Sequence, residues 1–163
     1  MSLTLEDLTI DPEGIDPVAL LADWEWAMES LMLPVLVTVM GDVFAQSDSG
    51  EVCFVDVVGG EVVPVCDSSE AFEEALDDDE FVAEFFYPER VQELRDAGLK
   101  LSDRQVFSHK LPLVVGGEDE VANFETADAI VHVSIHGQIH RQVKDLPDGA
   151  EIGEIEITPP ETP

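Results

Sequence analysis

The stretch VHVSIHGQIHRQVKD, residues 131–145, admits two interpretations, a helix and a strand. The choice between them decides which fold is predicted for the C-terminal part of this chain. It places three of the four histidines of the chain at a spacing of four residues. In a helix, His132, His136 and His140 would line one face, and two of them could chelate a metal ion. In a strand, the same three side chains would form a row along one face of a sheet.

The order of residue types favours the strand. The odd positions hold apolar residues, namely Val131, Val133, Ile135 and Ile139, and the even positions hold polar ones, namely His132, Ser134, His136, Gln138 and His140. Residues four apart on a strand stand about 13 Å from each other, at ~3.3 Å per residue. Three such imidazoles cannot share one ion, because metal–nitrogen bonds are only about 2 Å long.

The stretch is therefore predicted to be a strand with one polar face. Either a neighbouring element covers and satisfies this face, or the face recognises a partner through the donors and acceptors of His136, Gln138 and His140. Gly137, in the middle of the row, indicates a bulge or a close approach of another backbone.

Charge is the most unusual bulk property of this 163-residue, 45% hydrophobic chain, which is sized for one domain. It has 37 Asp and Glu against 7 Lys and Arg, a formal net charge of -30. Such a surface repels phosphates, so we expect no direct binding to nucleic acid or to an anionic membrane. The acidity serves either solubility or a salt-rich habitat, or it steers a basic partner.

No targeting or membrane segment is apparent. The N-terminal sequence is acidic from Glu6 onward, and the longest apolar run, residues 31–40, is too short to span a bilayer and is interrupted by Pro34. We expect a soluble cytoplasmic protein. Cys53 and Cys66 fit neither a CxxC redox motif nor a zinc knuckle and are predicted to be small buried side chains.

The N-terminal half predicts one helix and then a meander. Asp16 and Pro17 are typical of a helix start, and apolar residues at helical spacing continue until Pro34. From residue 35 to residue 65, short β-branched runs alternate with turns, which favours antiparallel strands. The turn SDSG at residues 47–50 lacks the carboxylates that a calcium loop requires.

Two further helices are predicted in the middle of the chain. Asp67 and Glu70 resemble a capping pair for a helix that continues to about residue 76. The run DDDE at residues 77–80 is expected to be a solvated turn rather than a cation site. A second helix starts at Pro88 and ends at Gly98.

The C-terminal part is predicted to be extended. Residues 105–115 and 123–143 are expected as strands separated by a loop, with a short edge strand at residues 151–157. The fold class is α+β, an antiparallel or mixed β-sheet of about five to seven strands flanked by about three helices. We expect a single domain over residues 1–163, with flexible termini at residues 1–15 and 158–163.

Catalytic motifs are missing from the sequence. It has no GxSxG elbow, no glycine-rich phosphate loop and no HExxH, and both cysteines fall in apolar strand contexts that favour an inert thiol. We therefore expect a protein that is not an enzyme and uses no cofactor and no metal.

Several local motifs together resemble the C-terminal domain of type VI secretion DNase-immunity proteins. They are WEW at 24–26, GDVF at 41–44, SDSGEVCFVD at 47–56, VGGE at 58–61, LPLVVGGEDEVANFE at 111–125 and VHVSIHGQIHRQVKDLPDG at 131–149. The likeness runs from residue 24 to residue 149, and its most specific part is GQIHRQ with the following LPDG.

The resemblance implies an intracellular α+β protein that binds and neutralises a cognate toxin, in the best-described case a secreted nuclease. The residues that match the family motifs are Trp24, Trp26, Gly41, Asp42, Phe44, Gly116, Gly117, Asn123, Gly137, Gln138, Ile139, His140 and Gln142. Most of them are typical of residues that determine a fold. A nuclease must present basic surface to DNA, and an acidic protein can occupy that surface by mimicking phosphate.

Two alternatives remain open. The first is an acidic scaffold domain without a toxin partner, which gene context would separate from an immunity protein. The second is a metal-dependent enzyme that uses His109, His132, His136, His140 or the acidic run at residues 77–80. Bound metal in protein purified without added metal would favour it.

Overall fold

The computed structural model describes residues 3–11, 13–146 and 155–158, and its fold is α+β, as predicted. Six α-helices lie in these residues, against about three expected. They are α1 (Leu5–Leu8), α2 (Pro17–Leu21), α3 (Ser69–Leu76), α4 (Asp79–Phe86), α5 (Pro88–Asp96) and α6 (Ala129–Val143). Among them, no helix is both long enough and apolar enough to cross a membrane.

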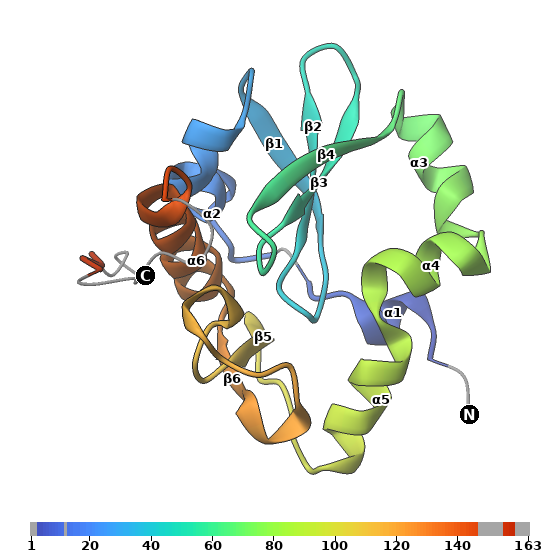
Figure 1. The fold of residues 1–163 in the computed structure, drawn as a ribbon. Helices are drawn as coiled ribbons and strands as arrows, with labels where there is room; N and C mark the ends of the chain where they lie inside the picture. Colours follow the sequence, from blue (N-terminus) through green and yellow to red (C-terminus); the bar gives the residue numbers. More distant parts are fainter. Residues whose placement is uncertain (1–2, 12, 147–154, 159–163) are drawn as a thin grey trace.

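Six strands form two antiparallel sheets. The larger sheet has the order β1 (Met32–Val37), β2 (Val43–Ser47), β3 (Val52–Asp56) and β4 (Glu61–Cys66), and the smaller one pairs β5 (Gln105–His109) with β6 (Phe124–Asp128). The predicted meander is therefore confirmed. In Figure 1 the larger sheet stands between α2 and α6 on one side and the chain of helices α3, α4 and α5 on the other.

The larger sheet separates two apolar cores, because successive side chains of a strand point to opposite faces. Val43 and Val55 pack with α2 and α6 in one core. Phe44 and Phe54 belong to the other core, where the Phe44 ring lies 4.9 Å from the ring of Phe72 on α3 and 5.5 Å from that of Phe86 on α4. The motif residue Phe44 is thus a core residue.

The first predicted helix is shorter than expected. Asp16 caps α2 as predicted, because its Oδ1 accepts from Val18 N at 2.9 Å. After α2, however, the chain tightens into a 3₁₀-helix, η1 (Ala22–Ala27). Pro34 does not end a helix. It lies inside the edge strand β1, beside a bulge, and edge strands and bulges are the positions at which a sheet tolerates proline.

The acidic run at residues 77–80 lies at the junction of two helices. Ser68, rather than Asp67 and Glu70, caps α3 through Ala71 N. Asp78 caps α4, a helix that the sequence analysis missed, by accepting from Glu80 N at 2.9 Å. Carboxylates in a first turn are favoured because they interact with the positive end of the helix dipole.

The predicted strand over residues 123–143 is wrong beyond residue 128. The chain leaves β6 at Asp128, whose Oδ1 accepts from Ile130 N at 2.9 Å and from Val131 N at 3.2 Å, and this cap starts α6. The alternation of apolar and polar residues wrongly predicted a strand because the polar residues are as buried as the apolar ones. These buried polar residues are His132, Ser134, His136 and His140. The predicted edge strand at residues 151–157 is described only from residue 155, and residues 155–157 form no strand.

Gly137 lets α6 and η1 touch. A Cβ at Gly137 would lie 2.5 Å from Asp23 O and 2.8 Å from Trp24 Nε1. One turn earlier on α6, Val133 O accepts a hydrogen bond from Trp24 Nε1 at 2.8 Å. Gly137 therefore provides the close backbone approach that the sequence indicated, within a helix and without a bulge.

Replacing Gly137 by alanine is expected to destabilise the fold. The new methyl group would push η1 away from α6 and weaken the Trp24 hydrogen bond, a loss of about 1–3 kcal/mol although alanine is the better helix former. Chemical denaturation measures the change, with Arg141→Ala on the exposed side of α6 as the matched control. A Gly137→Ala protein as stable as the control would show that the two elements are not in close contact.

Candidate functional site

The histidines of α6 contact different parts of the fold. His132 Nδ1 lies 2.7 Å from Ser108 Oγ on β5. His140 Nε2 donates to the carbonyl oxygens of Val57 and Val58, both at 3.1 Å, in the turn between β3 and β4. Among the described residues, no three His, Cys, Asp or Glu side chains come close enough together to hold a metal ion.

His132 and His136 each keep a buried ring nitrogen, Nε2, that has no hydrogen-bond partner among the described residues, and that of His132 faces Gly41. The tautomer of His136 follows from its other nitrogen. Its Nδ1 lies 2.8 Å from the carbonyl oxygen of His132, and a carbonyl only accepts, so Nδ1 carries the proton. Nε2 therefore holds the lone pair. It is buried and has no hydrogen-bond partner among the described residues. Burial lowers the pKa of His136 to about 4, so the ring is neutral.

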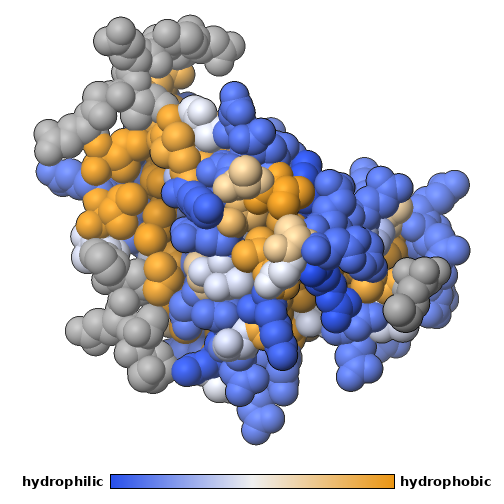
Figure 2. Space-filling view, turned by 90° about the horizontal axis from the view of Figure 1, so that it is seen from below, coloured by the Kyte–Doolittle hydropathy of each residue, from blue (hydrophilic) through white to orange (hydrophobic). Residues whose placement is uncertain are grey.

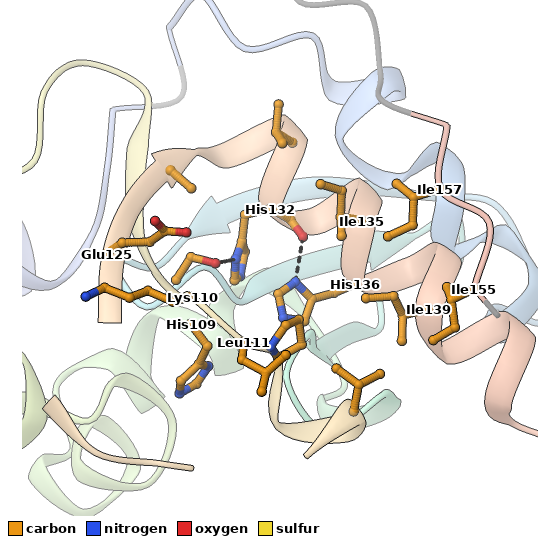
Figure 3. A pocket seen from close by; sticks show the side chains of 15 residues that line it. His109, Lys110, Leu111, Glu125, His132, Ile135, His136, Ile139, Ile155 and Ile157 are labelled. Atoms are coloured by element: carbon orange, nitrogen blue, oxygen red, sulfur yellow. Dashed lines mark hydrogen bonds between the residues drawn. The ribbon is translucent and has the colours of Figure 1, made fainter. Parts of the chain in front are cut away.

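His136 lies at the floor of a groove of about 500 Å³ between α6 and the loop that follows β5 (Figure 3). We call it the His136 groove. Its walls are apolar and are formed by Leu111, Val115, Ile135, Ile139, Ile155 and Ile157. Lys110 and Glu125 are exposed and lie at its edge. In Figure 2, apolar residues gather on the side of the molecule where Figure 1 places α6 and the C-terminal segment.

Two glutamines of α6 hold the C-terminal wall of this groove. The Gln138 amide accepts from Thr158 N and donates to Thr158 O, both at 2.7 Å. Gln142 makes the same pair of bonds with Glu156, at 3.0 and 2.6 Å. Glutamines four apart on the helix thus match residues two apart on the extended segment. Gln138 and Gln142 serve the fold and are not free for a partner.

Three motif residues shape the opposite wall. The Asn123 side chain accepts from Leu111 N at 3.0 Å and donates to the carbonyl oxygens of Leu111 and Glu118, both at 2.9 Å. Gly116 has a left-handed φ of 105°, and a Cβ at Gly117 would overlap the Leu111 carbonyl. These residues fix the loop that includes η2 (Leu113–Val115) and η3 (Val121–Asn123).

Gly41 and Asp42 stabilise the structure around His132 and the end of β3. Gly41 has a φ of 84°, and a Cβ there would overlap the His132 ring. Asp42 Oδ1 accepts from Val57 N at 3.0 Å, which ties the turn between β1 and β2 to the end of β3. Burial, with the nearby Asp56 carboxylate, raises the pKa of Asp42 well above its usual value. Both residues thus stabilise the fold.

The remaining motif residues lie in the core beside α6. Trp24 is fully buried, and Trp26 is half-buried and stacks on it with 5.7 Å between ring centroids. Ile139 lines the groove and is buried. Leu111, Ile135 and the C-terminal isoleucines were not predicted as site residues. Val131, Ile135 and Ile139 share one face of a helix, so a correct helix assignment would have predicted part of this wall.

A second, smaller hollow of about 250 Å³ lies beside His109. Arg90 and Asp119 line it, with 3.7 Å between Arg90 Nη2 and Asp119 Oδ2 and 3.4 Å between His109 Nε2 and Asp119 Oδ1. Tyr87, in a left-handed conformation with φ of 53°, also lines it. Of the residues that line this hollow, only His109 and Asp42 were candidate site residues from the sequence.

Part of the chain matches a known protein family. Residues 67–140 match the model for T6SS immunity protein Tdi1, C-terminal. The family suggested by the sequence motifs is thereby confirmed for these residues, and the motifs quoted from residues 24–61 lie outside the matched part. The matched part holds α3 to α5, both strands of the smaller sheet and most of α6, including the Asn123 loop and His136.

A solved structure has a similar fold. The crystal structure of Atu4351 from Agrobacterium tumefaciens superposes with a TM-score of 0.58 at 18% identity, over 80% of this chain and 65% of that one. The present chain therefore spans about two thirds of the length of Atu4351, and the likeness is one of fold. No curated protein matches the chain.

The stability of the fold is expected to depend on pH through His136. Its folded pKa of about 4 lies below the usual 6.5, so the unfolded chain takes up this proton first. The stabilisation by the neutral ring is complete above pH 6.5 and is lost as pH falls from 6.5 to about 4, a change of up to about 3 kcal/mol.

Denaturation of the protein and of His136→Leu at several pH values isolates this contribution. Asp42, with its raised pKa, acts in the opposite direction but is present in both proteins, as are His132 and His140. The stability difference between the two proteins should shrink steadily below pH 6.5. A constant difference would mean that His136 is not buried in its neutral form.

Proposed function

We propose that this protein binds and neutralises a cognate toxin in the cytoplasm and catalyses no reaction. The observation that carries the proposal is the match of residues 67–140 to an immunity-protein family, which supports an immunity role. The matched residues include one wall and the floor of the His136 groove, so the part of the chain that resembles the family also forms most of this groove.

Charge supports a basic toxin such as a nuclease. The chain has 7 Lys and Arg for 37 Asp and Glu. Three of these few cations, Arg90, Arg95 and Lys144, lie within 4 Å of carboxylates, which leaves most acids without a cationic neighbour. A surface of this kind attracts the basic face that a nuclease presents to DNA.

The chemistry of the site supports a binding protein over an enzyme. Ser108 and His132 are paired like a nucleophile and its base, but the other ring nitrogen of His132 faces Gly41 instead of a carboxylate. Burial also lowers the pKa of His132 well below its usual value, which makes it a poor base. Burial raises the pKa of Cys53 to about 11, so its thiol stays protonated.

The proposal predicts rescue from a neighbouring toxin. The protein should capture one product of the genes adjacent to its own at moderate salt, and its expression should restore growth of cells that produce this toxin. A heat-unfolded sample controls for non-specific capture by an acidic chain. If no neighbouring product binds and no growth is restored, the chain shares the family fold without the immunity role, and the scaffold alternative takes precedence.

Association with the toxin is expected to depend on salt. If acidic side chains steer the encounter, the association rate should fall about tenfold or more between about 50 mM and about 500 mM salt, while the dissociation rate changes little. Stopped-flow or surface-based kinetics measure both rates. An association rate that does not change with salt would rule out electrostatic steering. The acidity would then be explained by solubility or a salt-rich habitat.

A further inference from the structure

The His136 groove combines apolar walls with an unused hydrogen-bond acceptor, His136 Nε2, at its floor. Two other lining histidines also have a buried nitrogen without a partner among the described residues, His109 Nδ1 and His132 Nε2, and the latter faces Gly41. His136 is 3% exposed, and its Nε2 has no partner among the described residues. A buried acceptor without a donor is unfavourable, because it has lost its hydrogen bond to bulk water without a replacement. An occupant that brings a donor to this atom would restore the lost bond.

His140, Gln138 and Gln142 are already engaged, and the unpartnered Nε2 of His132 faces Gly41, so His136 supplies the acceptor of α6 that an occupant of the groove can meet. His140 donates to Val57 and Val58, and Gln138 and Gln142 hold the C-terminal segment. Of the three residues that the sequence suggested for recognition, only His136 is available.

The walls favour an apolar body of considerable size. Leu111 is 49% exposed and Ile157 is 39% exposed, unusually high for large apolar side chains. Ile135 of α6 also lines the groove (Figure 3). At about 500 Å³ the groove has room for a large aromatic side chain. Apolar surface that remains open in this way is typical of a protein interaction site.

We propose that the His136 groove binds a tryptophan side chain of the protein partner, with the indole N–H donating to His136 Nε2. Indole has one donor and no acceptor, so it satisfies His136 and brings no unmet group of its own. A tyrosine hydroxyl would bring lone pairs that the isoleucine walls cannot satisfy. A lysine or arginine would have to shed its hydration among the apolar walls, and the carboxylate of Glu125 lies at the edge of the groove, where Lys110 also lies.

This proposal rests on the proposed function for the identity of the partner, but the chemistry of the groove can be tested without one. The full chain is titrated with indole and with N-methylindole, which has the same ring system and no N–H, and amide NMR reports which residues shift. Indole should shift residues around Leu111, His136 and Ile157 and bind about fivefold more tightly than N-methylindole, as expected for one hydrogen bond.

A variant and a matched control locate the effect. In His136→Leu, which keeps the floor apolar, indole should bind no better than N-methylindole. Val35→Ala, an exposed position on β1, should retain the preference. Equal binding of the two probes to the unchanged protein would overturn the assignment of the acceptor, and the absence of binding by either would overturn the groove itself; neither result depends on how well the variant folds.

The toxin then tests the partner. Once a neutralised toxin is in hand, His136→Leu should weaken its binding about tenfold or more, as expected at an interface hot spot, and Val35→Ala should not. Unchanged toxin binding by His136→Leu, together with a clear indole preference, would overturn the tryptophan of the partner as the occupant. If no toxin binds but indole is preferred, the immunity proposal fails while the chemistry of the groove stands.

Discussion

The contact between α6 and η1 is the interaction on which the rest of the structure depends. Trp24 is fully buried and donates to a carbonyl of α6 one turn before Gly137, where the missing side chain makes room for it. Ser134, also on α6, donates to the Asp23 carboxylate beside it. A tryptophan that is both bonded and buried allows the helix little rotation or sliding. The register of α6 is therefore set from the N-terminal segment.

That register determines what each histidine meets. Spaced by four residues, the three rings follow one side of α6. The first meets Ser108 of β5 and the last meets the turn after β3. The middle ring, His136, lines the groove and keeps an unused acceptor, whereas the unpartnered Nε2 of His132 faces Gly41. The free nitrogen is thus a consequence of how α6 is placed. It gives the floor of the groove a position at which a partner can be chosen by hydrogen bonding.

The larger sheet and α5 could be predicted from the sequence because their signals are local: β-branched runs between turns, and a proline and a glycine at the two ends of a helix. The helix α6 could not be predicted by alternation, which treats His132 and Ser134 as solvent-facing. Both are buried and bonded, and only tertiary partners make that possible. The Asp128 cap was the local sign of a helix. The groove unites Leu111, Ile135 and Ile155 from three distant segments, a convergence that local patterns do not encode.

The immunity-family match covers the floor and one wall of the groove, and the central claim is that this face meets the partner. Hydrogen–deuterium exchange of the protein, alone and with the toxin that it neutralises, tests the claim most directly. Slower exchange in the complex at residues 111–115 and 155–158, with α3 and α4 unchanged, is the predicted result. Protection confined to α3, α4 and α5, with the groove walls exchanging as in the free protein, would contradict it.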